Sequence, residues 1–368
     1  MVLSRSLLGE LALEAGFDLV AFGPADPGAD AARFAEWIAA GRHGDMSYLA
    51  RNAERIQDPS RLVEGAKSTL ALGFDYGSNA AAIQGGARIA RYASGRDYHR
   101  ALGKRLRTIE AGLEKLGLTR SEFRSGVDAV PVLERALAAR AGLGFLAKSG
   151  GIIHAKRGPW LLLAEIVTSR ELPEAEVAAG SCGSCTACLD ACPTDALVAP
   201  FQVDARRCLS YTTIEKRGPI PPELREPQGD WLFGCDICIE VCPFTSRSAK
   251  RRRDPDLAPH RVVETWDLVG VLELDPQSFD EQWTGTALRR ATRNGLRRNA
   301  AIVLGNRGDR SAAPQLCAVL RDQDAGVRTS AAWALSRLGA EREAVAHAVD
   351  AELDPSVKAD LAASLARF

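Results

Sequence analysis

Aromatic residues and long apolar runs are scarce in this chain of 368 residues. Aromatics make up 6% of the residues, against 46% apolar and 26% charged residues. This composition is typical of a soluble globular protein and excludes a disordered or fibrous one. Arg5, Glu10, Glu14 and Asp18 interrupt the N-terminal stretch. We therefore expect neither a signal peptide nor a membrane span, and we predict a cytoplasmic protein.

The chain also lacks an excess of either charge, since Lys plus Arg and Asp plus Glu both number 47. A general affinity for polyanions is therefore not indicated. Arginines nevertheless gather between residues 284 and 310, where Asp309 is the single acid. This pattern predicts a basic patch on a neutral molecule, and a solvated helix face is the alternative.

Cysteine is almost absent outside one segment. Eight of the nine cysteines lie between Cys182 and Cys242. Such crowding in a reducing compartment favours metal ligation over disulfide bonds. The ninth, Cys317, lies in an Ala/Leu-rich helical pattern, and we expect it to be buried packing.

The spacing of these cysteines indicates iron–sulfur clusters. The run Cys-x2-Cys-x2-Cys-x3-Cys-Pro from Cys182 reproduces the bacterial ferredoxin motif, whose fourth cysteine binds a neighbouring cluster. A second run, Cys235-x2-Cys238-x3-Cys242-Pro243, lacks one ligand that Cys208 can supply. The crossed ferredoxin pattern then predicts two four-iron four-sulfur clusters: cluster one on Cys182, Cys185, Cys188 and Cys242, and cluster two on Cys192, Cys208, Cys235 and Cys238. The alternatives are two four-cysteine zinc sites or a thioredoxin-like CxxC pair.

The first part of the chain mixes helical and strand patterns. Amphipathic segments at 101–116 and 132–141 predict helices, the second with Pro131 in its first turn. Apolar runs at 68–74 and 160–168 predict strands that are buried on at least one face.

The C-terminal part repeats. Similar Ala/Leu-rich segments begin at Arg297, Arg328 and Lys358, at offsets of 31 and 30 residues. This period predicts helical HEAT-like repeats, and a plain helical bundle is the alternative.

These patterns predict an α+β protein of three domains. They are an α/β-type N-terminal domain at 1–170, a ferredoxin-like two-cluster module at 171–246, and a connector with α-helical HEAT-like repeats at 247–368. The electron acceptor must lie in the first domain, because the repeats carry no cofactor signature. Gly142 to Ala147 fits the dinucleotide pattern G-x-G-x-x-A, but a helical pattern precedes it where a strand is required, so a Rossmann site is disfavoured.

Several stretches resemble one known family, the epoxyqueuosine reductases, in order and spacing. They are RIARYASGRDYH from Arg88, VDAVPVLERALAARAGLGFLAK from Val127, VDARRCLSY from Val203 and GCDICIEVCP from Gly234. The resemblance covers nearly the whole chain. It implies an enzyme that reduces the epoxide of epoxyqueuosine in tRNA to the alkene of queuosine, using cobalamin in the N-terminal domain beside the two clusters. It also implies the tRNA anticodon stem-loop and an external reductase or a flavodoxin- or ferredoxin-type electron donor as partners, and we expect a monomer.

The resemblance assigns roles to individual residues. Asp128 matches the proton donor, and a helix cap ahead of Pro131 is the alternative. The positions expected near cobalamin are Arg55, Asp128, Ser210 and the backbone around Ile152 and Leu163, with Tyr98 and His99 as further pocket residues. Ile152 and Leu163 would otherwise be ordinary core, and Tyr98 and His99 a structural pair.

Other residues are expected to contact tRNA. Lys216 matches a tRNA-contacting position of the family, and a solvated surface lysine is the alternative. The arginine cluster suits an RNA backbone, since each phosphate contact releases counterions. The arginines predicted to bind tRNA are Arg289, Arg290, Arg293, Arg297 and Arg298.

Two other functions remain open from the sequence. One is a corrinoid-dependent enzyme similar to a reductive dehalogenase, which would act on a small molecule and need no RNA-binding repeats. The other is a non-catalytic ferredoxin-type electron carrier, which would need no cofactor pocket in the first 170 residues.

Overall fold

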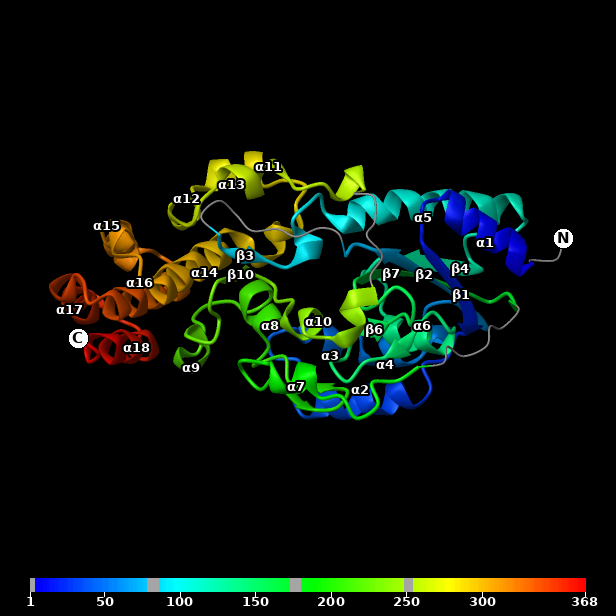
Figure 1. The fold of residues 1–368 in the computed structure, drawn as a ribbon, viewed down its shortest axis with the longest axis horizontal. Coiled ribbons are helices and arrows are strands. Elements are labelled where there is room, and N and C mark those ends of the chain that lie inside the picture. The colour runs from blue at the N-terminus through cyan, green and yellow to red at the C-terminus, as the bar shows by residue number, and fades with distance from the viewer. Residues whose placement is uncertain (1–3, 78–85, 173–179, 248–253) are drawn as a thin grey trace. The chain divides into compact units, whose positions relative to one another are not determined.

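A computed structural model describes residues 4–77, 86–172, 180–247 and 254–368 (Figure 1). The chain forms two compact units, each assembled from separate stretches of sequence. The first unit comprises Met1–Asn79, Asp97–Asp204 and Ile237–Leu257, and the second comprises Ala80–Arg96, Ala205–Asp236 and Ala258–Phe368. Among the described residues, no helix combines the length and apolar character needed to cross a membrane.

A four-stranded antiparallel sheet lies at the centre of the first unit. Its strands, in spatial order, are β1 (Leu19–Pro24), β2 (Ser68–Asp75), β7 (Leu161–Thr168) and β4 (Phe123–Gly126). The two central strands, β2 and β7, pair along their whole length, and nearly all of their residues are buried. The expected strands at 68–74 and 160–168 are therefore confirmed.

Helices cover both faces of this sheet (Figure 1). On one face lie α1 (Arg5–Glu14) and α5 (Tyr98–Lys115), where the guanidinium of Arg105 lies 4.7 Å from the centre of the Phe74 ring. On the other face lies α6 (Glu134–Arg140). A Cβ at Gly23 of β1 would come within 2.5 Å of the Cα of Ala141, so a glycine there lets the end of α6 approach the sheet.

The two predicted helices of this unit begin at different places from those expected. Asp97 caps α5 by accepting a hydrogen bond from the backbone N–H of His99 at 3.0 Å, so this helix starts at Tyr98. The other helix, α6, begins at Glu134 with Leu133 as its N-cap. The prediction that Pro131 lies in its first turn is wrong, because Pro131 precedes this N-cap by two residues and lies inside a turn in which the N–H of Val132 donates to the carbonyl of Val130.

Shorter elements complete the first unit. They are α2 (Ala29–Ala39), α3 (Ser47–Arg51), α4 (Ala53–Gln57), β5 (Phe145–Leu146), β6 (Ile152–Ile153), α7 (Ala187–Asp190), β8 (Leu197–Ala199), β9 (Gln202–Val203) and α10 (Ile237–Glu240). In the cysteine-rich segment, α7 and α10 pack against each other. The dinucleotide-like pattern at 142–147 follows α6 and ends in β5, so the strand that a Rossmann motif requires does not precede it.

The second unit consists mainly of helices. They are α8 (Leu209–Ile214), α9 (Pro222–Arg225), α11 (Arg261–Thr265), α12 (Leu268–Leu272), α13 (Pro276–Gln282), α14 (Thr292–Arg307), α15 (Ala313–Ala318), α16 (Ala325–Leu338), α17 (Arg342–Ala351) and α18 (Pro355–Leu365). A small parallel pair, β3 (Arg88–Ile89) with β10 (Trp231–Phe233), joins them.

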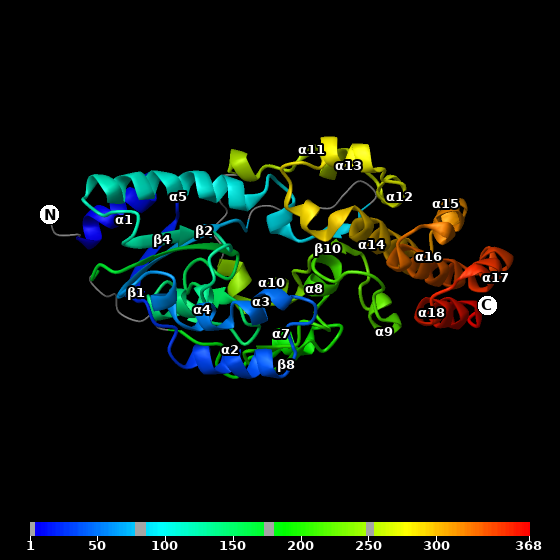
Figure 2. The same cartoon turned by 180° about the vertical axis from the view of Figure 1, so that it is seen from behind.

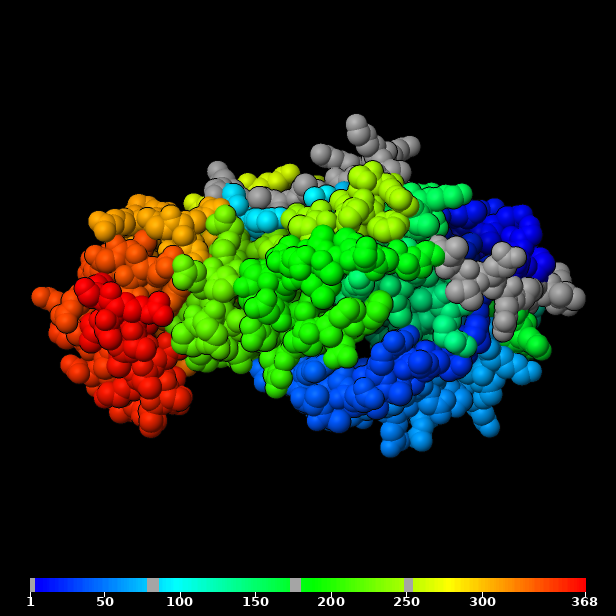
Figure 3. Space-filling view, turned by 60° about the horizontal axis from the view of Figure 1, so that its bottom comes forward, coloured from blue at the N-terminus to red at the C-terminus, as the bar shows by residue number. Residues whose placement is uncertain are grey.

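The repeat helices stack in sequence order (Figure 2). The predicted segments from Arg297, Arg328 and Lys358 lie in α14, α16 and α18, and each of these helices packs on the next. The residues of α17 and α18, in red, fill one end of this unit (Figure 3). Trp283 and Trp333 are buried in the core, and Cys317, which was expected to be buried, packs against this core but is only partly buried.

Candidate functional site

Asp128 lies two residues after the end of β4, on the loop that leads to α6. Its φ of 55° is in the left-handed region, which few residues other than glycine adopt. Such conformations persist where the surroundings impose them, and they are common at functional sites. Leu133 is the N-cap of α6, so the alternative that Asp128 caps this helix is wrong.

A glycine sets the course of this loop. A Cβ at Gly126 would lie 2.0 Å from Cγ2 of Val130, so only a residue without a side chain lets the chain fold back here. Val130 then packs near the cluster formed by Val63, Val132, Leu137 and Val167. The loop that carries Asp128 is thus anchored at both ends by apolar contacts.

Tyr98 and His99, from the first turn of α5, lie beside Asp128. The Tyr98 hydroxyl donates a hydrogen bond to Oδ2 of Asp128 at 2.6 Å, and Nε2 of His99 lies 3.7 Å from the same oxygen. Nδ1 of His99 lies 2.7 Å from Oδ1 of Asp97. The structure therefore brings together three of the residues that the sequence predicted for the pocket. It adds Asp97, which sequence reasoning had missed.

The two acids set the protonation of His99. Burial disfavours the imidazolium, but hydrogen bonds and charge attraction from Asp128 and Asp97 outweigh it and raise the pKa of His99 to about 9. For Asp128, burial favours the neutral acid, but hydrogen bonds from His99 and Tyr98 outweigh it and hold the pKa below its usual value. At neutral pH the proton shared by this pair therefore resides on the imidazole.

Two further acids that the sequence reasoning missed lie close to Asp128. Glu134 begins α6, and Glu165 is a buried residue of β7 opposite Gly126 of β4. Burial raises the pKa of both carboxyl groups, and repulsion from Asp128 raises it further. The available signal was Glu165 itself, a single acid inside the apolar run WLLLAEIVT.

The remaining residues predicted near cobalamin are dispersed over the elements. Ile152 and Leu163 are buried together in one apolar cluster with Ala138 and Leu143. Arg55 lies exposed on α4. Ser210 belongs to α8 of the second unit. Their proximity to a corrinoid stays a prediction.

The four cysteines predicted for cluster one all belong to the first unit. Burial raises the pKa of Cys188, and the nearby Cys182 and Cys242 thiols raise it further. Burial also raises the pKa of Cys242, with further contributions from Cys182 and Cys185. Charge repulsion therefore acts among these four thiols when they ionise. Phe145, Ala147, Ile153 and Phe244 form the apolar cluster that includes Cys182 and Cys242.

Lys148 supports this cysteine loop, and sequence reasoning did not identify it. Its backbone N–H donates to Sγ of Cys182 at 3.4 Å, and its Nζ donates to the carbonyls of Gly183 and Cys185 at 2.8 and 2.9 Å. Hydrogen bonds to thiolate sulfurs are one of the means by which proteins tune iron–sulfur clusters.

Different local elements hold the cysteines predicted for cluster two. Sγ of Cys192 accepts a hydrogen bond from the N–H of Ala196 at 3.3 Å. Cys208 is the N-cap of α8, and Cys235 follows β10 through Gly234, where a Cβ would meet that of Ala90 at 2.5 Å. Among the described residues, no group of three or more His, Cys, Asp or Glu side chains is arranged around a single metal ion.

The arginines predicted to contact tRNA divide into two classes. Arg297 and Arg298 are buried; Arg297 pairs with Asp322 at 2.6 Å, and Arg298 donates to the carbonyls of Lys216, Gly218 and Thr212. Buried guanidinium groups cannot reach a phosphate, so the expectation of tRNA contacts at these two residues is corrected to a structural role.

The other members of the predicted tRNA set lie nearer the surface of the second unit. Arg289 pairs with Asp280 at 2.9 Å, and Arg290 pairs with Glu215 at 2.7 Å. Nε of Arg293 donates to the carbonyl of Leu274 at 2.6 Å. Asp280 and Glu215, which lie outside the arginine-rich segment, therefore offset part of its positive charge.

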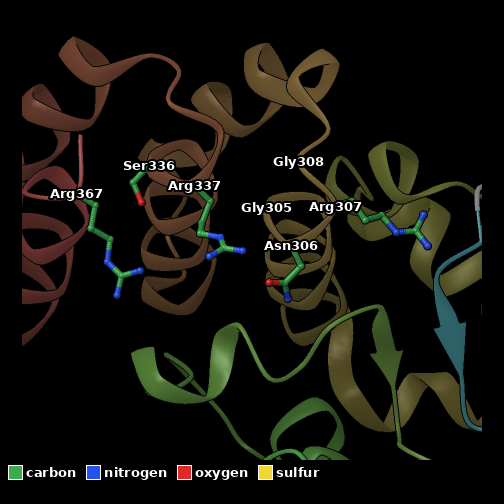
Figure 4. Close-up of a pocket in the computed structure, with 7 residues that line it drawn as sticks. All are labelled: Gly305, Asn306, Arg307, Gly308, Ser336, Arg337 and Arg367. Atoms are coloured by element: carbon green, nitrogen blue, oxygen red, sulfur yellow. The ribbon is translucent and has the colours of Figure 1, made fainter.

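A separate basic hollow of about 500 Å³ lies among the repeat helices (Figure 4). Arg307, Arg337 and Arg367 line it, together with Gly305, Asn306, Gly308 and Ser336. Arg307 and Arg337 are paired with Asp230 and Glu226. None of the residues predicted from the sequence for the active site lines this hollow.

Comparisons with known families agree with this anatomy. Residues 57–129 match the model described as "Epoxyqueuosine reductase QueG, DUF1730". Residues 181–245 match a 4Fe-4S double cluster binding domain, and residues 282–366 match HEAT repeats. The expectations of an iron–sulfur module and of HEAT-like repeats are thus confirmed.

Full-length relatives show the same similarity. The chain is 37% identical to the epoxyqueuosine reductase of Xanthomonas campestris over 341 residues, which cover 89% of this chain and 94% of that protein. It is 36% identical to the enzyme of Pseudomonas aeruginosa over 344 residues, which cover 89% and 92%.

Solved structures extend the similarity to the whole fold. A selenomethionine-labelled epoxyqueuosine reductase superposes with a TM-score of 0.87 at 30% identity, covering 99% of this chain and 98% of the other. The Bacillus subtilis enzyme, described with its aspartate catalytic loop swung out of the active site, gives 0.87 at 29% identity, with the same coverage. An epoxyqueuosine reductase with an epoxyqueuosine-modified tRNA stem loop gives 0.86 at 30% identity, again with the same coverage. The α+β class is confirmed, and the chain belongs to the epoxyqueuosine reductase family of oxidoreductases.

Proposed function

We propose that this chain reduces the epoxide of epoxyqueuosine in tRNA to the alkene of queuosine. The observation that carries the proposal is the arrangement of Asp128, Tyr98 and His99 in a unit that also holds the cluster-one cysteines. An acid poised beside a redox module suits a reaction that needs both protons and electrons. The relatives named for this activity support the same conclusion.

The residues present fit two four-iron four-sulfur clusters. The cluster-one thiols sense one another, apolar side chains shield them, and Lys148 donates to Cys182. Clusters in such a setting supply one-electron transfer. We assign cluster one to Cys182, Cys185, Cys188 and Cys242, and cluster two to Cys192, Cys208, Cys235 and Cys238, the latter from the cysteine spacing alone.

Most of the residues predicted near cobalamin lie in the first unit. Ile152 and Leu163 belong to an apolar cluster, and Gly150 and Gly151 leave the last two positions before β6 without side chains. Asp128 is half exposed beside its two partners. We propose that cobalamin binds here, with Arg55 and Ser210 as further contacts; when bound, it supplies the redox chemistry that breaks the carbon–oxygen bond.

The protein's own contribution is to hold and deliver protons. Asp128 acts as the general acid toward the departing epoxide oxygen, and His99 holds the proton that Asp128 must receive first. Tyr98 fixes the carboxyl group through its 2.6 Å hydrogen bond. Such general acid assistance typically contributes about 10²- to 10⁴-fold in rate.

The proposed partners are a tRNA anticodon stem-loop and an external low-potential electron donor. A solved relative with a tRNA stem loop supports the first. Arg289, Arg290, Arg293 and Lys216 remain the proposed contacts. The division into a catalytic domain at 1–170, a cluster module at 171–246 and a tRNA-binding repeat domain at 247–368 is part of this proposal, and so is a cytoplasmic monomer.

The test is turnover on the modified nucleoside. Protein reconstituted with iron, sulfide and cobalamin is reduced and incubated with epoxide-bearing tRNA, and the nucleosides are then analysed by mass spectrometry. The proposal predicts loss of one oxygen from the modified nucleoside, dependent on both cofactors. An unchanged epoxide with fully loaded, reduced protein would refute it.

The same preparation separates the two rival functions. A small-molecule dehalogenase-like enzyme would retain the corrin and fail to bind tRNA. A ferredoxin-type carrier would retain clusters and no corrin. Retention of both cofactors together with tRNA binding agrees only with the proposed reductase.

A further inference from the structure

An unpartnered acid lies in the apolar layer beneath α6. Glu165 lies between Leu163 and Val167 on β7, and these two neighbours pack in the apolar clusters that include α6 residues Ala138 and Leu137. Because alternate residues of a strand share a face, the Glu165 side chain points into the same layer. It is 2% exposed, and neither carboxyl oxygen has a hydrogen-bond partner among the residues that the structure describes.

Such a residue is costly for the fold. A buried carboxylate without a partner pays a large desolvation penalty, so the group stays neutral instead. Burial indeed raises the pKa of Glu165 well above its ordinary value. An apolar side chain of similar size would be more stable at this position. Sites that retain such costs are often functional.

Glu134 is intermediate in exposure between Glu165 and Asp128. It begins α6, which packs on β7, and its side chain is 22% exposed, compared with 55% for Asp128. The charged groups around it are Asp128 from the loop, Glu165 from β7, His99 from α5 and the adjacent Arg135, whose Nε lies 3.7 Å from Oε1. The exposure of the three carboxyl groups thus increases from Glu165 through Glu134 to Asp128.

The balance of these groups leaves a proton available at neutral pH. Burial and the charge of Asp128 raise the pKa of Glu134 to about 7, while Arg135 and His99 oppose this effect. Two neighbouring acids in an apolar layer do not both ionise readily, so the pair retains a proton. A pKa near the working pH suits a group that must both release and regain a proton.

The reaction requires more than one proton. Conversion of an epoxide to an alkene breaks two carbon–oxygen bonds; the external donor supplies two electrons, and the oxygen takes two protons and leaves as water. Asp128 carries one proton at a time, and hydrogen bonds from His99 and Tyr98 outweigh burial and lower its pKa, which favours the ionised carboxylate at neutral pH. It must therefore be protonated again during each turnover.

We propose that Glu134 and Glu165 form a proton store that recharges Asp128 during each reduction. Glu134 passes the proton to Asp128. Glu165, on β7 beneath α6, helps to retain the proton on the Glu134 and Glu165 pair. This inference rests on the proposed reductase function. It adds Glu134 and Glu165 to the proton path formed by Asp128, Tyr98 and His99.

The experiment compares Glu134→Gln and Glu165→Met with wild type, and uses Glu64→Gln, an exposed glutamate of the same unit, as the matched control. Holoenzyme is assayed on epoxide-bearing tRNA from pH 5.5 to 9, with and without added formate as an external acid. Cluster and corrin content, and the KM for tRNA, are measured in parallel. Thermal unfolding is recorded for each variant.

The proposal predicts that kcat falls about tenfold or more in both store variants, while KM, cofactor content and the Glu64→Gln variant stay unchanged. In Glu134→Gln, the change of kcat with pH near 7 should disappear, and added formate should restore activity. Glu165→Met should unfold at a higher temperature than wild type and still turn over more slowly.

Active wild type together with store variants of unchanged rate and pH profile would overturn this inference and leave the proposed function standing. So would a Glu134→Gln variant that is slow but shows no formate rescue and no change of pH profile. An inactive, fully loaded wild type would instead count against the reductase function itself.

Discussion

The chemistry at the scale of single residues depends on the position of one proton in the Asp128 and His99 pair. The raised pKa of His99 and the lowered pKa of Asp128 favour the proton on the imidazole at neutral pH, because Tyr98, His99 and Arg135 all stabilise the ionised Asp128. We therefore propose that Asp128 carries protons to the substrate. The resemblance identified the residue; its φ of 55° and its partners come from long-range contacts that no local pattern encodes.

Asp128→Asn should bind clusters, corrin and tRNA as wild type does and lose about 10²- to 10⁴-fold in turnover, since an amide cannot act as the general acid. Nucleoside mass analysis gives the rate, and absorbance spectra give the cofactor content. Wild-type activity in a fully loaded variant would remove the catalytic assignment.

His99 links stability to pH. Its pKa is raised from 6.5 to about 9, so the stabilisation from its charged form is complete below pH 6.5 and is lost as the pH rises through 9. Comparison with His99→Gln isolates this contribution from that of the thiols. Denaturant midpoints should fall more steeply for wild type than for the variant between pH 6.5 and 9, and parallel curves would contradict the pairing.

At the scale of elements, the turn after β4 fixes the position of the loop that carries the proposed proton donor, Asp128. Gly126→Ala places a methyl group 2.0 Å from Cγ2 of Val130, so the loop from Val127 to Val132 must shift. A misplacement of about 1 Å can cost about 10²-fold in rate. We therefore expect a large fall in kcat with unchanged iron content, whereas activity close to wild type would show that the loop adapts.

The helix α14 carries two kinds of arginine. Arg298→Ala removes donors from three backbone carbonyls at a fully buried position, which at about 1 kcal/mol or more for each buried group amounts to roughly 3 kcal/mol or more of unfolding free energy. Arg290→Ala, at an exposed pair just before this helix, should change stability by less than about 1 kcal/mol.

The Arg290→Ala and Arg298→Ala variants should also differ in their effect on tRNA affinity. Arg290→Ala should weaken binding and reduce the salt slope by about 0.9 for a lost phosphate contact. Salt titrations of binding to an anticodon stem-loop measure this slope. An unchanged slope would remove Arg290 from the interface, and a stable Arg298→Ala protein would contradict the structural role of that residue.

Sequence patterns located the elements well and the side-chain partners poorly. The apolar runs of β2 and β7, the period of α14, α16 and α18, and the cysteine spacing are all local signals. The burial of Arg298 depends on backbone carbonyls more than 80 residues away in the sequence, and the role of Glu165 depends on the stacking of α6 over β7. Such contacts are visible only after folding.

At the scale of the whole molecule, the chain is proposed to combine a cluster module, a catalytic domain and a repeat domain. Each chain should hold about eight irons and eight sulfides, because two cubane clusters are proposed. Cys188→Ser should lose about half of the iron, whereas Cys317→Ala, outside the cysteine module, should lose none. Iron assays with equal loss in both variants, or zinc in place of iron, would contradict the cluster assignment.

The central claim is that electrons held on this chain reduce the epoxide of a bound tRNA. Holoenzyme is reduced fully, freed of external reductant, and mixed once with epoxide-bearing tRNA, and queuosine formed per chain is measured by mass analysis. The account predicts up to about one queuosine per chain from the two one-electron clusters, and none from protein without corrin. Absence of product from reduced holoenzyme, or equal product without corrin, would contradict it.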